Sequence, residues 1–480
     1  MLFDIVFLQI FSPGECAGSL EPPGFFDYLG RYGPVMKKNR PGWAILTFLL
    51  ASLLPSPGFS RENASGQDYV QAFLQGGASN FLIWGFDYVV LQAGYAQISP
   101  KTWRDNLREG FQWDNSEFHT NQILHPYQGS SYYNAARVNG FSFWGSVPFT
   151  VFGSLVWEFF GERENASLND VITTGFGGVA MGEMGHRLSA ALVRGRSDGA
   201  GRVAREAVAL LVNPVLTFNR LIYGDRVLYR LPGRTPPVDL EFHSGLNGTW
   251  ERRAFTIAFP HPFIGIGLRY GDPFGAAGDL RAPYDYFRLR VGLYGDVDNP
   301  GSDVFAHGLL WGRRLYPGRE GRALAGVFQH FDYMDNYKFK FAANGVGGGI
   351  ETSFPLDGER ELGFLLHLFG VALGGVDSRY SRGLTGRDYS LGPGAGMKSE
   401  LRCSFPAGRS LALAYSYYWF FTLSGSDREN GAGFLSGQGE AAVTDTTRLG
   451  LEFRLYHRWS DAGFDDALSF GLRTYLSFSL

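Results

Sequence analysis

Apolar and polar residues alternate with a period of two over the second half of the chain, from about residue 238 to the end. In the segment 449–456, Leu449, Leu451, Phe453 and Leu455 share one face, and Gly, Glu, Arg and Tyr take the other. The segments 287–294 and 468–480 repeat this arrangement. Further strands are expected near 252–268, 303–315, 321–334, 338–354, 361–375, 390–405 and 409–422. Such strands predict an antiparallel transmembrane β-barrel of about 10–14 strands.

A soluble β-sandwich shows the same alternation, because each of its strands packs one face on a core. A predicted signal peptide, a terminal strand that runs to the last residue, and aromatic residues at strand ends favour the membrane barrel. Tyr284, Tyr286, Trp419 and Phe420 are expected at the membrane interfaces. Turns are expected at 296–303 and 424–433, and the glycines of 345–349 leave room for a plug helix or a bulge.

The segment from 81 to about 225 lacks this alternation and predicts a Gly-rich helical domain. Residues 138–157 hold no charge, but Gly and Pro interrupt them, so we expect a broken helix buried in protein. Residues 168–193 and 205–222 predict two more helices, and the second is stopped at Asn213-Pro214. Gly178 and Gly182 lie on one helical face, which permits close packing. Residues 81–96 fit either a strand or an apolar helix.

An export signal is predicted near the N-terminus. A basic cluster at 37–40 precedes the apolar run 43–54, and a small residue, Ser60, follows before a polar stretch. We therefore expect a signal peptide at 36–60, with translation starting at Met36 and 1–35 as an over-extended start or a disordered extension. A signal anchor after a genuine extension is the alternative. Cleavage would leave Cys403 as the one cysteine, which excludes an intramolecular disulfide.

These patterns divide the chain into a helical domain followed by a barrel. We expect an N-terminal linker or periplasmic segment at 61–110, a helical signature domain at 111–230 and an outer-membrane β-barrel at 231–480. The composition agrees, because 66 glycines and an aromatic content of 16% describe a folded chain. The formal net charge of −3 gives no basic field, so no nucleic-acid partner is expected.

Polar residues of the helical domain are the candidates for chemistry. Glu183 reaches His186 and Arg187 at helical spacings of three and four, most simply as an ion pair. Arg137 is expected to pair with Glu158 or Glu162 in the interior, or to orient a lipid phosphate. The candidate ligand or structural cluster comprises Asn121, His125, Tyr127, Asn134, Arg137, Glu158, Asn169, Asp170, Glu183, Asn213 and Arg220. No metal site and no cofactor are predicted, because Glu183 and His186 lack a second such pair.

The same segments resemble a bacterial family of unknown function whose members carry a signal peptide and look like outer-membrane proteins. The resemblance covers about 110–225 and rests on the segments 121–144, 153–162, 167–183 and 213–225. The family pattern falls on His125, Pro126, Tyr127, Asn134, Arg137, Trp157, Glu158, Asn169, Asp170, Gly182, Glu183, Asn213, Pro214, Asn219 and Arg220. The family implies no activity, so no catalytic role follows from it.

The sequence therefore predicts an outer-membrane β-barrel of unknown specific activity, acting as an envelope structural, channel or transport component. The helical domain is expected to pack within or under the barrel, as a helical plug or as a scaffold. The alternative is a membrane-embedded enzyme acting on envelope lipid, with His125, Glu158 and Glu183 as acid–base candidates. Whether the chain is an enzyme is left open. A third interpretation is an inner-membrane helical protein that uses 138–157 as its membrane span and carries a periplasmic β-domain. Expected partners are outer-membrane lipid and the barrel assembly machinery, and the oligomeric state is left open.

Overall fold

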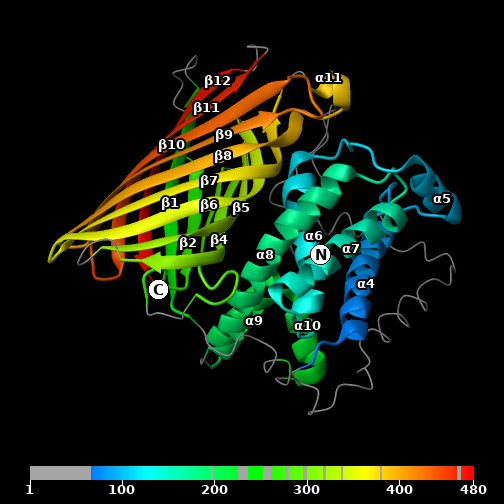
Figure 1. Cartoon of the computed structure of the whole chain (residues 1–480), viewed down its shortest axis with the longest axis horizontal. Coiled ribbons are helices and arrows are strands. Elements are labelled where there is room, and N and C mark those ends of the chain that lie inside the picture. Colours follow the sequence, from blue (N-terminus) through cyan, green and yellow to red (C-terminus); the bar gives the residue numbers. More distant parts are fainter. Residues whose placement is uncertain are drawn as a thin grey trace.

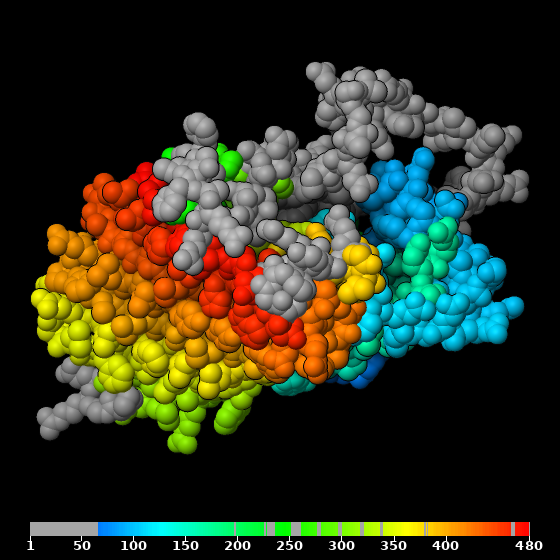
Figure 2. All heavy atoms as spheres, turned by 90° about the horizontal axis from the view of Figure 1, so that it is seen from above, coloured from blue at the N-terminus to red at the C-terminus, as the bar shows by residue number. Residues whose placement is uncertain are grey.

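The chain folds into a helical domain and a β-barrel that lie side by side (Figures 1 and 2). The computed structural model describes residues 66–195, 198–224, 227, 236–251, 261–275, 280–295, 300–316, 321–336, 339–378, 381–461 and 466–479. The predicted signal peptide at 36–60 and the segment 1–35 lie outside these residues.

The helical domain begins near residue 69, inside the segment predicted as a linker. Its α-helices are α4 (Tyr69–Phe86), α5 (Pro100–Glu109), α6 (His125–Arg137), α7 (Phe143–Val156), α8 (Leu168–Arg194), α9 (Ala200–Val212) and α10 (Pro214–Tyr223). Three π-helical turns interrupt them, η2 (Asp87–Leu91), η3 (Thr120–Leu124) and η4 (Trp157–Gly161). Residues 81–91 are thus helical rather than a strand, and the chain turns over 92–96. No helix in the described part of the chain has both the length and the apolar character needed to cross a bilayer.

Local sequence explains where these helices begin and end. The Ser167 hydroxyl accepts a hydrogen bond from the Asp170 amide and caps α8. Asn213 ends α9 and caps α10, whose first residue is Pro214, as the Asn-Pro pair predicts. The charge-free run 138–157 is broken as expected, since α7 starts only after Ser142. It is not fully buried, because Trp144 on its outer face is 61% exposed.

Helices α6 and α8 pack with their backbones in close contact. A Cβ atom added to Gly178 would lie 2.7 Å from the backbone of Gly129, and one added to Gly182 would lie 2.7 Å from the Tyr133 ring. Only glycine leaves room for such an approach, so the predicted role of these glycines is confirmed.

The second half of the chain forms a closed antiparallel barrel of 12 strands. Its first six strands are β1 (Val238–Glu251), β2 (His261–Tyr270), β3 (Phe287–Gly295), β4 (Pro300–Leu315), β5 (Arg322–Asn336) and β6 (Phe339–Asp357). The others are β7 (Arg360–Asp377), β8 (Tyr389–Phe405), β9 (Arg409–Phe421), β10 (Glu429–Ala442), β11 (Thr447–Ser460) and β12 (Ala467–Ser479), with the short helix α11 (Arg382–Thr385) before β8. Each strand pairs with its sequence neighbour, and β1 pairs with β12 to close the barrel.

Two of the predicted turns were placed too widely. β4 begins at Pro300, inside the predicted turn 296–303, and β10 begins at Glu429, inside the predicted turn 424–433. β10 begins with Glu, Asn, Gly, Ala and Gly, which resemble turn residues in sequence. The glycines of 345–349 mark a bulge, because the register between β6 and β7 shifts between Asn344 and Gly345.

Alternation along the strands places apolar side chains outside and polar ones inside. Leu449, Leu451 and Phe453 are exposed on β11, whereas Glu452 and Arg454 are buried in the lumen. The prediction of interfacial aromatic residues was wrong for three of four positions. Tyr284, Tyr286 and Phe420 are each no more than 2% exposed, because they pack on protein. Trp419 is partly buried.

The helical domain packs on the outer surface of the barrel wall, not inside the lumen. The inward face of β5 is identified by Asp332, which bonds Lys398 on β8 and Tyr418 on β9 across the interior. Phe331 and Tyr333 beside it must therefore point outward. Tyr333 stacks on Phe118 of the helical domain at a ring distance of 5.8 Å.

A second contact confirms this placement. Gln329, which shares the outward face of β5, donates from Nε2 to the carbonyl of Phe176 on α8 over 2.9 Å. The two views in Figures 1 and 2 agree in placing the helices beside the strands. The predicted helical plug is therefore wrong. The apolar side chains on the outside of the wall, such as Phe331 and Tyr333, pack against apolar side chains of the helical domain.

Candidate functional site

The signature residues of the helical domain form two buried polar groups, of which the first surrounds Glu183 on α8. Arg137 binds this carboxylate through two nitrogens, Nε over 2.7 Å and Nη2 over 3.0 Å. Arg187, one helical turn along, donates from Nε over 2.8 Å, and the Tyr133 hydroxyl donates over 2.8 Å. Both carboxylate oxygens are thus saturated, and the side chain is 0% exposed.

This ion group also connects the helices to the barrel. Arg187 donates from Nη1 to Asp285 and from Nη2 to the carbonyl of Pro283, both in the segment that leads into β3. Burial by itself would raise the pKa of Glu183, but Arg137 and Arg187 lower it to about 2. Glu183 is therefore a permanent anion at neutral pH.

The structure corrects two expectations about this group. Arg137 pairs with Glu183 and not with Glu158 or Glu162, because α6 and α8 lie in direct contact along their lengths. The expected pair of Glu183 with Arg187 is confirmed. His186 takes no part, since neither of its ring nitrogens has a hydrogen-bond partner among the described residues.

The second polar group consists of His125, Glu158 and Asp170. His125 follows the π-helical turn η3, and Glu158 lies within the π-helical turn η4. Such turns often mark functional positions, because they rotate side chains out of the regular helical order. His125 Nε2 lies 3.6 Å from an Asp170 oxygen, and the Ser167 amide donates to one Glu158 oxygen over 2.8 Å. The other oxygen of Glu158 is buried and has no hydrogen-bond partner among the described residues.

Excess negative charge dominates this second group, because Asp114 and Glu162 lie close to it. Burial and the neighbouring carboxylates raise the pKa values of Glu158 and Asp170 well above their ordinary range. The same causes raise the pKa of Glu162 to about 7, and burial lowers that of His125. The group can share protons, and His125, Glu158 and Asp170 are close enough to hold a cation.

The two groups do not converge on one cavity. Asp170 and Glu183 are 13 positions apart on α8, which corresponds to about 20 Å along a helix. Arg137 and Glu183 form a closed pair, and His125 and Glu158 are buried at the other end of the helix pair. A joint acid–base centre of His125, Glu158 and Glu183 is therefore not formed.

The remaining predicted residues fix local structure. Asn121 and Asn169 both donate to Asp114, over 2.9 and 2.6 Å. Asn134 accepts from Asn213 over 3.0 Å, which ties α6 to the start of α10. Tyr127 and Arg220 lie elsewhere on the domain, where they bond the Leu211 carbonyl and Glu206 respectively.

The barrel lumen contains functional candidates that the sequence did not reveal. One part of it is closed by aromatic side chains from strands on opposite sides of the barrel. Phe434 of β10 contacts Phe305 of β4 and Phe339 and Phe341 of β6, with ring distances between 4.9 and 6.2 Å. These rings and their neighbours, termed the aromatic layer, are Phe305, Met334, Phe339, Phe341, Phe369, Tyr418, Phe420, Phe434 and Tyr456.

A cavity of 640 Å³, termed the chamber, borders the aromatic layer. It reaches the end of the barrel where β1 begins and β12 ends. Charged side chains of both signs line this chamber. The basic ones are Arg269, Arg288, Arg290, Lys398, Arg402, Arg448 and Arg454, and the acidic ones are Asp239, Glu241, Glu351, Glu361, Glu400 and Glu452. Pairs such as Arg288 with Glu400 and Lys398 with Asp332 cross the lumen and hold its walls. The chamber is blind on the side of the aromatic layer.

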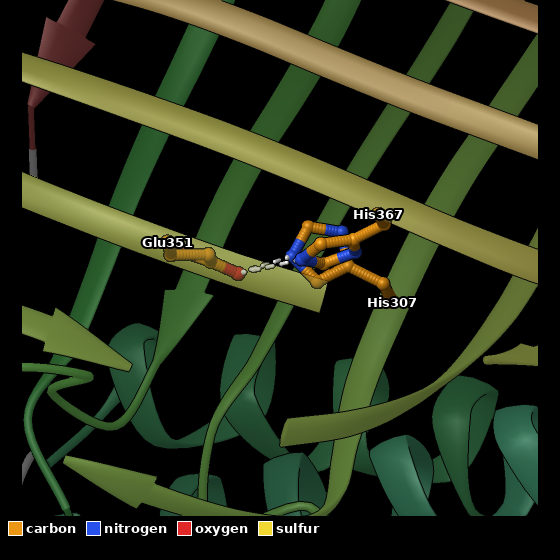
Figure 3. A group of neighbouring side chains, drawn as sticks. All are labelled: His307, Glu351 and His367. Carbon is orange, nitrogen blue, oxygen red and sulfur yellow. Dashed lines mark hydrogen bonds and ion pairs between the residues drawn. The ribbon is translucent and has the colours of Figure 1, made fainter. Parts of the chain in front are cut away.

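Two histidines and a glutamate gather on the wall of this chamber (Figure 3). Glu351 Oε1 lies 3.1 Å from His307 Nε2 and 3.6 Å from His367 Nε2. Glu351 lies on β6, His307 on β4 and His367 on β7, and each occupies an inward position of its strand. Alternation predicts that each faces inward, but the register that brings them together is not visible in the sequence.

Residues 110–215 match the family model of a domain of unknown function, DUF3943, which confirms the resemblance over that range. No curated protein matches the chain. Among solved structures, the NanC porin matches at 10% identity over 49% of this chain and 100% of that one, with a TM-score of 0.28.

Two further solved structures match about half of the chain. An outer-membrane channel from Pseudomonas putida F1 matches at 10% identity over 52% of this chain and 99% of that one, with a TM-score of 0.28. The KdgM porin matches at 8% identity over 50% and 99%, with a TM-score of 0.25. The chain thus resembles outer-membrane porins and channels in its barrel and DUF3943 in its helical domain.

Proposed function

We propose that the chain resides in the outer membrane, where its barrel is a channel or transport component in a closed state. Apolar side chains form an exposed belt on the outer face of the barrel, at positions that the helical domain does not cover. This belt comprises Leu246, Ile264, Ile266, Leu293, Phe364, Leu368, Leu401, Leu411, Leu413, Leu449, Leu451, Phe453, Leu472 and Leu476. A soluble protein rarely exposes so large an apolar surface, whereas lipid is its natural partner.

The observation that carries the functional proposal is the blind, charged chamber. Paired charges of both signs line it, as suits the passage or binding of a polar solute. The aromatic layer closes it, since Phe305 and Phe434 meet from opposite strands. Passage of a solute therefore requires these rings to move.

The helical domain acts as a scaffold on the wall in this proposal. It replaces lipid along β3–β7, where Phe331, Tyr333 and Leu373 are buried against it. Export by a signal peptide at 36–60, assembly by the barrel assembly machinery, and a boundary near 231 between the helical domain and the barrel complete the proposal. No nucleic acid takes part.

Membrane fractionation combined with gel migration tests the location. The full chain is expected in the outer-membrane fraction, and the unheated barrel is expected to migrate differently from the heated one. Sedimentation with the inner membrane, or identical migration before and after heating, would contradict the proposal.

Conductance across a planar bilayer tests the closed state. We expect the purified barrel to insert without a stable open-pore current, because the aromatic layer spans the lumen. A large and steady current from the unaltered chain would show that the layer does not close the barrel.

A further inference from the structure

We propose that His307, Glu351 and His367 bind one divalent transition-metal ion inside the barrel, and Zn²⁺ is the probe that we choose for it. Two imidazoles and one carboxylate are a ligand set that zinc and non-haem iron sites use. The inference goes beyond the proposed function, because metal binding can be measured whether or not the barrel conducts.

The distances between the donor atoms fit a metal ion. Two ligand atoms that each lie about 2.1 Å from a tetrahedral ion are about 3.4 Å apart. The carboxylate oxygen of Glu351 lies 3.1 Å from His307 Nε2 and 3.6 Å from His367 Nε2, which brackets this value. One ligand atom from each residue lies within 4.8 Å of the others. Figure 3 shows both rings turned toward the same carboxylate.

His367 provides a second observation that points to a ligand. Its side chain is 0% exposed, yet neither ring nitrogen makes a hydrogen bond to a described residue. The distance of 3.6 Å from Nε2 to Glu351 is too long for a hydrogen bond but suits two ligands of one ion. A buried imidazole without a hydrogen bond is costly unless something else binds it.

The surrounding residues hold these donors in place. The Phe328 ring stacks on His367 at 4.2 Å, and a Cβ atom at Gly349 would lie 2.1 Å from the same imidazole. Gly349 therefore makes the space that His367 occupies. The Tyr286 hydroxyl donates to the second oxygen of Glu351 over 2.6 Å, which leaves Oε1 directed at the histidines. Such outer contacts orient metal ligands in known sites.

The position of the group leaves one side of a bound ion accessible. His307 and Glu351 line the chamber, whereas His367 lies behind them. An ion held by three protein ligands keeps a fourth position for water or a solute. That position would face the chamber, where a solute with an anionic group can reach it.

Calorimetry on the folded barrel tests the proposal. The full chain, purified in detergent without a polyhistidine tag and treated with a chelator, is titrated with Zn²⁺. We expect one ion per chain, with affinity reduced about 100-fold or more in His367→Gln and in Glu351→Gln. His243→Gln is the matched control, since His243 also faces the lumen beside a carboxylate, Glu241, but has no second histidine.

A spectroscopic measurement on the unaltered chain keeps the proposal testable if the variants do not fold, as judged by their gel migration. Electron paramagnetic resonance of bound Cu²⁺ is expected to show coupling to two imidazole nitrogens. Binding that is equally tight in His367→Gln and Glu351→Gln, binding lost in His243→Gln, or the absence of stoichiometric Zn²⁺ and of nitrogen coupling would overturn the proposal.

Discussion

Replacing Glu183 by Gln removes the carboxylate that Arg137 and Arg187 share. Its pKa of about 2, against an ordinary 4.5, corresponds to about 3 kcal/mol of stabilisation at neutral pH. Loss of one member of a buried ion pair costs about as much, because its partners remain charged and buried. We therefore expect Glu183→Gln to lower the free energy of unfolding of the helical domain by about 3 kcal/mol.

Urea titration in detergent, followed by the helical circular-dichroism signal, measures this loss while gel migration reports whether the barrel is intact. Glu206→Gln is the matched control, because it breaks a partly exposed pair, with Arg220. Exposed pairs contribute under about 1 kcal/mol, so the control should unfold nearly as the unaltered domain does.

The pH dependence of the stability of the helical domain tests the role of Glu183 in a second way. The folded pKa of Glu183 is lowered, so its stabilisation is complete above 4.5 and is lost as the pH falls through about 2. Glu183→Gln should lack this loss. Two results would refute the assignment of Glu183 as the centre of the ion group. One is equal stability of the variant and the unaltered chain at neutral pH, and the other is an undiminished loss of stability at low pH in the variant.

Three further predictions concern other parts of the chain. Burial and the nearby Asp170 raise the folded pKa of Glu162 to about 7. The contribution of Glu162 to the free energy of unfolding is therefore complete below pH 4.5 and is lost as the pH rises through 7. Glu162→Gln should flatten the fall in the stability of the helical domain between about pH 5 and 8, and an unchanged slope would contradict this. Gly178→Ala should destabilise the helical domain by about 1–3 kcal/mol in the same urea titration, because the new Cβ meets the backbone of α6, whereas Gly175→Ala on the same helix should be neutral or stabilising. The double change Phe341→Ala with Phe434→Ala should give a conductance step in planar bilayers that the unaltered chain lacks, and a barrel that stays closed would show that other side chains close it.

The barrel was predictable because its signal is local. Each strand repeats the same two-residue alternation, as at Leu449, Leu451 and Phe453, and lipid outside makes that pattern nearly obligatory. Tyr284 and Tyr286 misled the prediction, because an aromatic residue at a strand end can face lipid or pack inward on protein. That choice depends on neighbours distant in the sequence.

The polar groups were predictable only in part. The pair of Glu183 with Arg187 follows from spacing on one helix, whereas the partner of Arg137 depends on which helix packs beside α6. The placement of the helices outside the wall could not be predicted either. It depends on outward residues such as Phe331, which look the same in sequence whether they face lipid or protein.

The cluster of His307, Glu351 and His367 shows the same limit. The three residues lie on separate strands, and only the register between β4, β5, β6 and β7 brings them together. No motif spacing marks such a group, because strand connections vary in length. The useful sequence signal is weaker: each residue occupies a position that alternation assigns to the lumen.

Disulfide trapping in cells tests most directly whether the helical domain lies outside the wall. In a chain whose Cys16 and Cys403 are replaced by Ser, Phe118→Cys is combined either with Tyr333→Cys, which faces outward, or with Met334→Cys, which faces the lumen. We expect a cross-link with Tyr333→Cys and none with Met334→Cys. A cross-link with Met334→Cys alone would place the helical domain inside the barrel and contradict its placement on the outer wall.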